Sequence, residues 1–326
     1  MRIAHCSDLH LLSLAGARAL DFANKRWIGG LNLLANRGRH YHSRVFEAMV
    51  ADFNRSAIDH ILVTGDVTNL AFEEEFRFAR RLFEAIRLGP EHVTVLPGNH
   101  DAYVARGAEY FSTHFEDYNR PDPGWAWSDE AAKAGKAGKV ADRWPVVRVR
   151  GPLALLALST SLATPWFTAW GRVGDEQLDR LAAALADPRL AGRFRLVAIH
   201  HPPAGERSRS AVRGLRDRDR FAAVIAEAGA ELILHGHEHL DLRAELPGPP
   251  GGGPPIAVRG IQSGTYEAGN PVRRARYRVY EIGEQRAGAS AAGRRPALVG
   301  ETLRVWDPER GEFATDEAST GGEAAA

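Results

Sequence analysis

The sequence predicts an α/β fold, because strands alternate with helices over most of the chain and polar motifs follow the strands. The alternation runs from residue 2 to about residue 234, and three further predicted strands then follow with no helix between them. Five of the predicted strands end in short motifs rich in Asp, His and Asn. We therefore expect an α/β core whose second sheet is partly antiparallel, with a polar site along one edge.

The first part of the chain contains three short apolar segments that end in polar turns, as expected for buried strands. Between them, two segments place apolar residues at helical spacing, and Gly89 with Pro90 ends the second of these. The predicted strands are residues 2–6, 60–64 and 93–96, and the predicted helices are residues 45–55 and 72–88.

The second part begins with residues 102–139, which we interpret as a helix followed by a flexible loop. A hairpin is expected around Gly151 and Pro152, and helices are expected at 177–185 and 221–228. The remaining predicted strands are residues 146–150, 153–159, 194–199, 231–234, 256–263, 276–282 and 298–305. We expect one domain over residues 1–314, with an insertion at 11–44, and a disordered tail over 315–326.

The composition favours an ordinary globular protein. A formal net charge of +1 over 326 residues creates no field that would attract nucleic acid, so no specific nucleic-acid binding is expected. The single cysteine, Cys6, cannot form an internal disulfide, and no apolar leader is visible at the N-terminus. No window approaches the roughly 18 apolar residues of a membrane span. These features favour a cytoplasmic location.

Seven side chains that follow the five strand ends are candidate metal ligands. Ligands of open α/β sheets bind beyond the carboxyl ends of the strands. In extended backbone, residues two apart point to the same side, so we expect each Asp-x-His or His-x-His pair to offer two donors to one region. Glycines at 65, 98 and 236 would relieve steric limits there. The candidates are Asp8, His10, Asp66, Asn99, His200, His237 and His239.

The donor types indicate which ions would bind. Carboxylate, imidazole and amide oxygen, without thiolate, suit Mn, Fe or Zn. Seven donors exceed the four that one tetrahedral ion needs, whereas two ions that share one carboxylate would use them all. Each motif taken singly is also an ordinary turn. Their joint occurrence at strand ends argues against that alternative.

Taken together, the motifs resemble those of the calcineurin-like metallophosphoesterases. The Asn-His-Asp and His-His-Pro-Pro motifs are most similar to the cyclic-nucleotide phosphodiesterase-type branch. This resemblance implies a four-layer α/β/β/α sandwich with mixed sheets and two divalent metal ions. The series reads Asp8-x-His10, Gly65-Asp66-x-x-Asn69, Gly98-Asn99-His100-Asp101, His200-His201-Pro202-Pro203 and Gly236-His237-x-His239.

The resemblance also implies a role for each residue. His100 would lie over the phosphate as general acid or charge stabiliser, with Asp101 orienting it, and His200 rather than His201 would bind metal. A hydroxide between the ions would attack the phosphorus of a phosphodiester in line. The first ion would be bound by Asp8, His10, Asp66 and His239, and the second by Asp66, Asn99, His200 and His237, with Asp66 bridging.

The insertion at 11–44 offers a clue to the substrate. Its apolar residues Trp27, Ile28, Leu31 and Leu34 recur at helical spacing among the basic residues Arg18, Lys25, Arg26, Arg37, Arg39 and Arg44. Such a helix either packs its apolar side on the core, which we favour, or contacts the inner face of an anionic membrane.

Two further functions therefore stay open beside phosphodiester hydrolysis. Pyrophosphatases that cleave UDP-2,3-diacylglucosamine combine these motifs with a similar insertion, but many of them have Asn-Arg-Asp where this chain has Asn99, His100 and Asp101. A phosphomonoesterase would use the same two-metal centre. A scaffold without activity is disfavoured, because no ligand is missing.

Two more groups of residues lie near the predicted site. The basic run over 207–220 either binds a substrate phosphate, with Arg216 as the candidate residue, or is a solvated loop. Five aromatic residues either stack a base or pack in a core or interface, and we favour packing. They are Trp125, Trp127, Trp166, Phe167 and Trp170.

Overall fold

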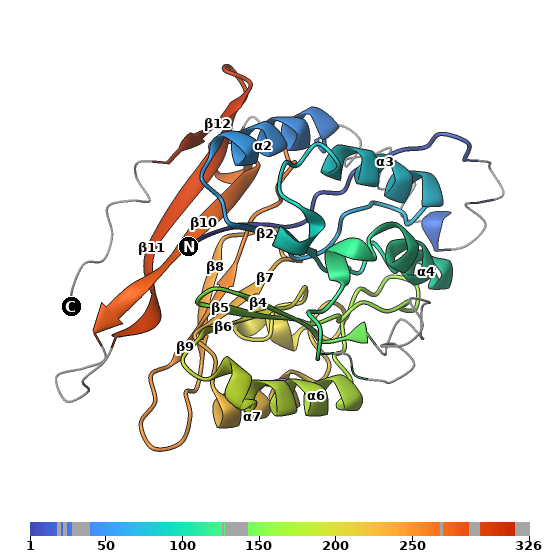
Figure 1. Ribbon diagram of the computed structural model, residues 1–326. Helices are drawn as coiled ribbons and strands as arrows, with labels where there is room; N and C mark the ends of the chain where they lie inside the picture. Colours follow the sequence, from blue (N-terminus) through green and yellow to red (C-terminus); the bar gives the residue numbers. More distant parts are fainter. Residues whose placement is uncertain are drawn as a thin grey trace.

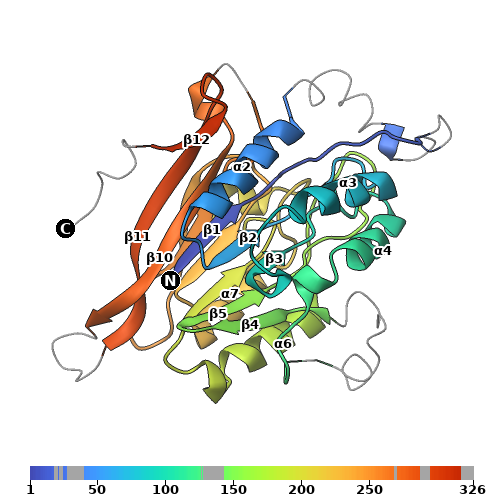
Figure 2. The same ribbon diagram turned by 45° about the horizontal axis from the view of Figure 1, so that its top comes forward.

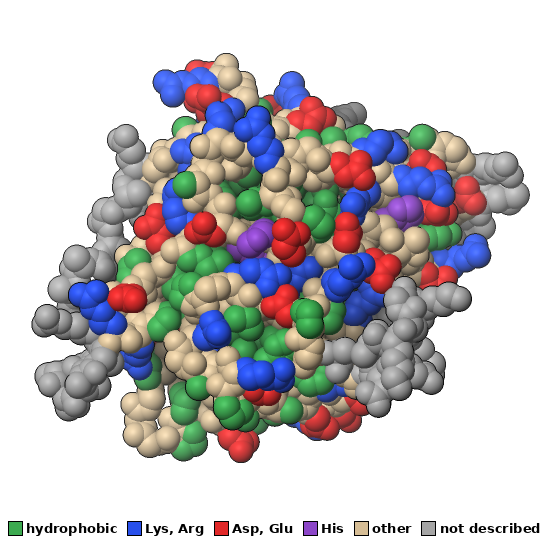
Figure 3. Space-filling view, viewed as in Figure 1, with side chains coloured by type: hydrophobic (Ala, Val, Ile, Leu, Met, Phe, Trp, Pro, Cys, Tyr) green, Lys and Arg blue, Asp and Glu red, His purple; other side chains and the backbone are tan. Residues whose placement is uncertain are grey.

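The computed structural model describes residues 1–17, 21, 25–27, 40–125, 127, 143–267, 270–286 and 294–316. Two six-stranded sheets pack face to face, and helices cover the outer face of each (Figure 1). The predicted α/β fold with two mixed sheets is confirmed. Within the described ranges, no helix is long and apolar enough to cross a membrane. Charged side chains of both signs are interspersed over the face in Figure 3.

The first sheet has the order β12-β11-β10-β1-β2-β3 (Figure 2). Its parallel half contains β1 (Arg2–Cys6), β2 (His60–Val63) and β3 (Val93–Val95). Cys6 lies opposite Val63, which lies opposite Val95, so these three strands end at the same level. The antiparallel half contains β10 (Arg276–Arg286), β11 (Arg294–Asp307) and β12 (Glu312–Thr315).

The second sheet has the order β4-β5-β6-β7-β9-β8. Its four central strands are parallel, and both edge strands are antiparallel to their neighbours. The strands are β4 (Val146–Arg150), β5 (Leu153–Ala157), β6 (Phe194–Ala198), β7 (Leu232–His235), β8 (Leu242–Leu246) and β9 (Ile256–Gly260).

Alternation along β5 shows how the layers form. Leu153, Leu155 and Ala157 belong to the core between the two sheets, whereas Ala154 and Leu156 belong to the core beneath the helices. Strands buried on both faces therefore read as unbroken apolar runs. The helices α2 (Ser43–Arg55), α3 (Glu73–Phe83) and α4 (Ala105–His114) cover the first sheet, and α6 (Asp175–Leu185) and α7 (Arg218–Ala228) cover the second.

Several predicted boundaries need correction. The helix predicted over 72–88 ends at Phe83, because the chain then turns and packs Ile86 into the core. The strands β8 and β12 were not predicted, since both are short and largely exposed. Thr315, the first residue of the predicted tail, belongs to β12 and pairs with Arg304 of β11. Residues from 317 onward lie outside the described ranges. Most of the predicted amphipathic helix, at 18–20, 22–24 and 28–39, also lies outside them.

Candidate metal centre

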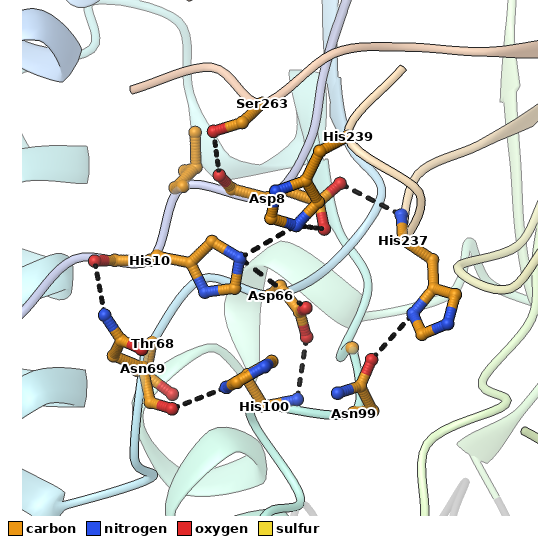
Figure 4. Close-up of polar contacts among 12 residues, drawn as sticks. Asp8, His10, Asp66, Thr68, Asn69, Asn99, His100, His237, His239 and Ser263 are labelled. Carbon is orange, nitrogen blue, oxygen red and sulfur yellow. Dashed lines mark hydrogen bonds and ion pairs between the residues drawn. The ribbon is translucent and has the colours of Figure 1, made fainter. Parts of the chain in front are cut away.

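The five polar motifs meet at one edge of the sandwich, where the parallel strands of both sheets end. Figure 4 shows residues of the motifs that follow β1, β2, β3 and β7. The loops after β1 and β2 continue side by side, with the Asp8 N–H donating to the Gly65 carbonyl oxygen at 2.9 Å. The His10 N–H likewise donates to the Asp66 carbonyl oxygen at 2.9 Å. Side chains from loops far apart in the sequence therefore converge, as the strand-end positions predicted.

A first group of donors contains Asp8, His10, Asp66 and His239, whose candidate ligand atoms all lie within 4.8 Å of one another. His239 Nε2 is 3.1 Å from Asp8 Oδ1 and 3.2 Å from His10 Nε2. His10 Nε2 is 3.8 Å from Asp66 Oδ2. We call these four residues the first donor cluster.

A second group contains Asp66, Asn99, His200 and His237, and we call it the second donor cluster. Asn99 Oδ1 is 2.8 Å from His237 Nδ1 and 3.2 Å from His200 Nε2. His200 Nε2 is 3.5 Å from Asp66 Oδ1. The two carboxylate oxygens of Asp66 thus face different clusters, which is the position of a bridging ligand.

The hydrogen bonding of His200 fits a cation in the second cluster. Its Nδ1 donates to the Thr64 carbonyl oxygen at 2.6 Å, so its Nε2 carries a lone pair. That lone pair faces the oxygens of Asn99 and Asp66, which are also acceptors. Three acceptors that face one another repel unless a cation lies between them. The residues therefore suit the two divalent ions that the motifs imply.

His201 lies close to His200 and His237 but is bonded elsewhere. Its Nδ1 is 2.7 Å from Thr160 Oγ1, and its Nε2 donates to the Ala169 carbonyl oxygen at 3.0 Å. Because both ring nitrogens have protein partners, His201 has no lone pair to offer. The geometry favours His200 as the ligand of the pair.

The backbone at five of the candidate ligands is left-handed, and this corrects the expectation of extended backbone. Such φ values are rare for residues other than glycine and cost roughly 1–3 kcal/mol each. Strain of this kind persists where the surrounding structure requires a particular side-chain direction. The φ values are 54° at Asp8, 45° at His10, 52° at Asp66, 74° at His237 and 51° at His239.

Two glycines allow the clusters to form by their lack of a side chain. A Cβ atom at Gly98 would collide with the carboxylate and backbone of Asp66. A Cβ atom at Gly236 would collide with Ser7 and the Asp8 carboxylate. Both glycines therefore permit close approach to a candidate ligand, rather than only a sharp turn.

Burial controls the charge of several of these groups. It lowers the pKa of His200 and lowers that of His237 well below the ordinary value, so both rings are neutral and can offer a lone pair. Burial alone would raise the pKa of Asp8, but His239, His200 and Ser7 together outweigh it and the net shift is downward. Neutral imidazoles beside an ionised carboxylate are the forms that bind divalent metals.

His100 lies beside both clusters. Its backbone N–H donates to Asp66 Oδ1 at 2.7 Å, and its Nδ1 donates to the Asn69 carbonyl oxygen at 2.6 Å (Figure 4). The ring packs edge-on against His10 at 4.8 Å and stacks on Tyr103 at 5.4 Å. Since Nδ1 carries the hydrogen, Nε2 is the nitrogen that could act on a substrate.

Asp101 is bonded to other partners than His100, contrary to the expectation that it orients that ring. Its Oδ1 accepts from the N–H and hydroxyl of Thr68 at 2.8 and 2.9 Å. Its Oδ2 accepts from the N–H groups of Gly98 at 2.8 Å and Val67 at 3.1 Å. Burial raises the pKa of Asp101 to about 6, although these hydrogen bonds oppose the shift. The carboxylate therefore ties the loop after β2 to the loop after β3.

The loop over 205–217 places a different arginine near the centre from the one predicted. Arg216 donates to the Ala211 carbonyl oxygen at 2.8 Å and lies over the Trp170 ring. Arg213 instead donates to the carbonyl oxygen of His237 at 3.2 Å. Sequence alone did not separate the two, because both belong to one run of arginines.

Two of the five aromatic residues that were predicted to pack are exposed. Trp125 is buried, as expected, whereas Trp166 and Phe167 are 53% and 75% exposed. Trp166 and Phe167 therefore do not pack in the core, because the turn that holds them projects from the surface, and their packing at an interface stays a prediction. The described basic residues of the insertion contact other parts of the protein. Lys25 donates to Thr164 and Thr168, and Arg26 donates to the carbonyl oxygens of Leu70 and Ala71. Arg44 pairs with Glu267.

Solved structures of other proteins share this fold. Solved structures with a similar fold include a dimetal phosphatase from Danio rerio, at 12% identity and a TM-score of 0.53, covering 97% of this chain and 98% of that one. A purple acid phosphatase from yellow lupin has 12% identity and a TM-score of 0.49, with 97% and 52% of the two chains covered. No curated protein sequence matches the chain. The model of the calcineurin-like phosphoesterases matches residues 1–241. The chain therefore belongs to the calcineurin-like phosphoesterase family.

Proposed function

We propose that the protein is a dinuclear metal-dependent hydrolase of phosphodiester bonds. The observation that carries this proposal is the pair of donor clusters that share Asp66, with His100 beside both. Two bound ions would supply an activated water and offset the charge of the phosphoryl oxygens. We propose Mn, Fe or Zn as these ions, since the donors are oxygen and imidazole nitrogen.

The protein residues would then divide the work of phosphoester cleavage. Asp8, His10 and His239 would hold one ion, Asn99, His200 and His237 the other, and Asp66 both. In its protonated form, His100 would donate a proton from Nε2 to the leaving oxygen or a hydrogen bond to the phosphate, because its Nδ1 hydrogen is bonded to the Asn69 carbonyl oxygen. General acid catalysis of this kind typically contributes ~10²–10⁴-fold to the rate.

Turnover of two chromogenic esters would test the proposal. With Mn²⁺ added, bis(p-nitrophenyl) phosphate should be cleaved faster than p-nitrophenyl phosphate. The reverse preference would favour a phosphomonoesterase. Turnover of neither ester would favour a scaffold without activity. The resemblance of the Asn-His-Asp and His-His-Pro-Pro motifs to phosphodiesterases supports the first outcome.

The role of His100 has its own test. His100→Ala should retain two bound ions but lose most of its activity, since its ring packs against His10 and the bond to Asp66 comes from its backbone N–H. His10→Ala serves as the matched control and should lose an ion together with activity. If His100→Ala loses metal as His10→Ala does, the acid role is wrong.

A second candidate is a pyrophosphatase for a lipid-linked substrate such as UDP-2,3-diacylglucosamine, acting at an anionic membrane. Apolar side chains on the segments beside the centre favour it: Trp27 is 58% exposed and Val212 is 47% exposed, in addition to Trp166 and Phe167. Lys25 joins the segment of Trp27 to Thr168, and the Ala169 N–H donates to the Val212 carbonyl oxygen. These four exposed side chains therefore lie on connected segments.

Vesicle flotation would test this candidate. Wild-type protein should float with vesicles of anionic phospholipid, and Phe167→Ser should float less. Val299→Ser is the matched control, because Val299 is also exposed, at 55%, but lies on β11. Absence of binding by the wild type, or equal loss in both variants, would remove this candidate.

A further inference from the structure

Tyr41 contacts the first donor cluster although it belongs to none of the sequence motifs. Its hydroxyl oxygen lies 2.9 Å from His239 Nδ1. Its ring packs edge-on against His10, with ring centroids 4.8 Å apart. Tyr41 therefore touches two of the four residues of that cluster, and it comes from the end of the 11–44 insertion.

The segment over 263–267 fixes the backbone and ring of Tyr41. Tyr41 forms an antiparallel bridge with Tyr266, and their rings meet edge-on at 5.2 Å. The Glu267 N–H donates to the His40 carbonyl oxygen at 2.7 Å, and Arg44 pairs with the Glu267 carboxylate at 2.6 Å. Contacts on both sides of Tyr41 thus hold it against one segment.

The same segment holds the loop that carries Asp8. The Ser263 hydroxyl donates to the Asp8 carbonyl oxygen at 2.6 Å (Figure 4), and the Gly264 N–H donates to the Ser7 carbonyl oxygen at 2.8 Å. Tyr41 and Asp8 are therefore positioned by one piece of backbone. The position of the Tyr41 hydroxyl is therefore fixed relative to the first donor cluster.

The chemistry of His239 shows what the hydroxyl can do. A neutral imidazole binds a cation through the nitrogen that lacks hydrogen. Nε2 of His239 faces Asp8 and His10, so Nε2 is the ligand atom and Nδ1 must carry the hydrogen. The Tyr41 oxygen is then the acceptor for that hydrogen. Outer partners of this kind fix the tautomer and the ring orientation, and their loss typically weakens metal binding by ~10–100-fold.

We propose that Tyr41 is a positioning residue of the first metal site, whose hydroxyl oxygen holds the His239 ring for metal binding. The proposal rests on the proposed function, because it requires the first donor cluster to bind an ion. It also extends that function, since it makes the end of the insertion a part of the metal site.

Metal affinity of Tyr41→Phe tests the proposal, because phenylalanine keeps the ring and removes only the oxygen. Dissociation constants for Mn²⁺ would be measured by competition with a chromogenic chelator, starting from metal-free protein. One of two ions should bind ~10–100-fold more weakly, while the other is unchanged. Tyr266→Phe is the matched control, since it removes a neighbouring hydroxyl from the same pair of rings and should bind both ions normally.

The thermal midpoint of the metal-free proteins separates positioning from packing. It should be similar in Tyr41→Phe and wild type, whereas Tyr41→Leu should lower it by removing the ring contacts. Unchanged Mn²⁺ affinity in folded Tyr41→Phe would overturn the proposal, and so would equal weakening in Tyr266→Phe. If wild-type protein binds no ion at all, the proposed function itself fails, which is a distinguishable result.

Discussion

The adjacent histidines His200 and His201 allow a strict test of the metal centre, because both are fully buried but are bonded to different groups. The two variants of this test are His200→Ala and His201→Ala. His200 presents Nε2 to Asn99 and Asp66, whereas His201 uses both ring nitrogens on protein partners. His200→Ala should therefore lose a metal ion, whereas His201→Ala should mainly lose folding stability.

The size of the stability effect follows from the hydrogen bonds. His201→Ala leaves the Thr160 hydroxyl and the Ala169 carbonyl oxygen without their partner. An unsatisfied buried polar group costs about 1–3 kcal/mol, so loss of the buried Thr160 partner should lower the free energy of unfolding by about that amount, and the partly buried Ala169 carbonyl should add less. His200→Ala leaves only the Thr64 carbonyl oxygen unpaired, which should cost about 1–3 kcal/mol in metal-free protein.

Metal analysis after dialysis and urea unfolding of metal-free protein would measure both effects. His201→Ala should retain two ions, and His200→Ala should retain one. The assignment of donors would be refuted if His201→Ala lost an ion while its free energy of unfolding stayed within about 0.5 kcal/mol of wild type. That result would mean that the hydrogen bonds of His201 are not its main role.

Three further predictions concern residues around the centre. Asp101→Asn should lower the free energy of unfolding by about 1–3 kcal/mol, because in either orientation its amide nitrogen would face at least one buried N–H donor; an unchanged urea midpoint would contradict this. Burial raises the pKa of Glu75 from 4.5 to about 8. Between these two pH values the folded state holds a proton that the unfolded state releases. The free energy of unfolding should therefore fall as the pH rises through this range, by up to ~1.4 kcal/mol per pH unit. Glu75→Gln should flatten that slope between pH 5 and pH 8, and parallel slopes would argue against it. Arg213→Ala should raise KM more than Arg216→Ala, because only Arg213 is bonded beside His237, and the opposite order would disprove it.

The sequence by itself predicted the buried strands and the donor types of the site. Apolar runs such as Leu153–Ala157 identified buried strands, because residues on both faces of a covered strand must be apolar. The position of Asp8, Asp66 and His237 after such strands then placed them at one edge. Both inferences depend only on residues close together in the chain.

Only the tertiary structure decided which group contacts which donor. Asp101 is bonded to Thr68 rather than to His100, His201 is bonded to Thr160, and Tyr41 reaches His239 from the insertion. Ser263 holds the Asp8 loop from 255 positions away in the sequence. Strand and donor type are local properties that spacing reveals, whereas hydrogen-bond partners, tautomers and left-handed ligand backbone arise only when distant loops pack together.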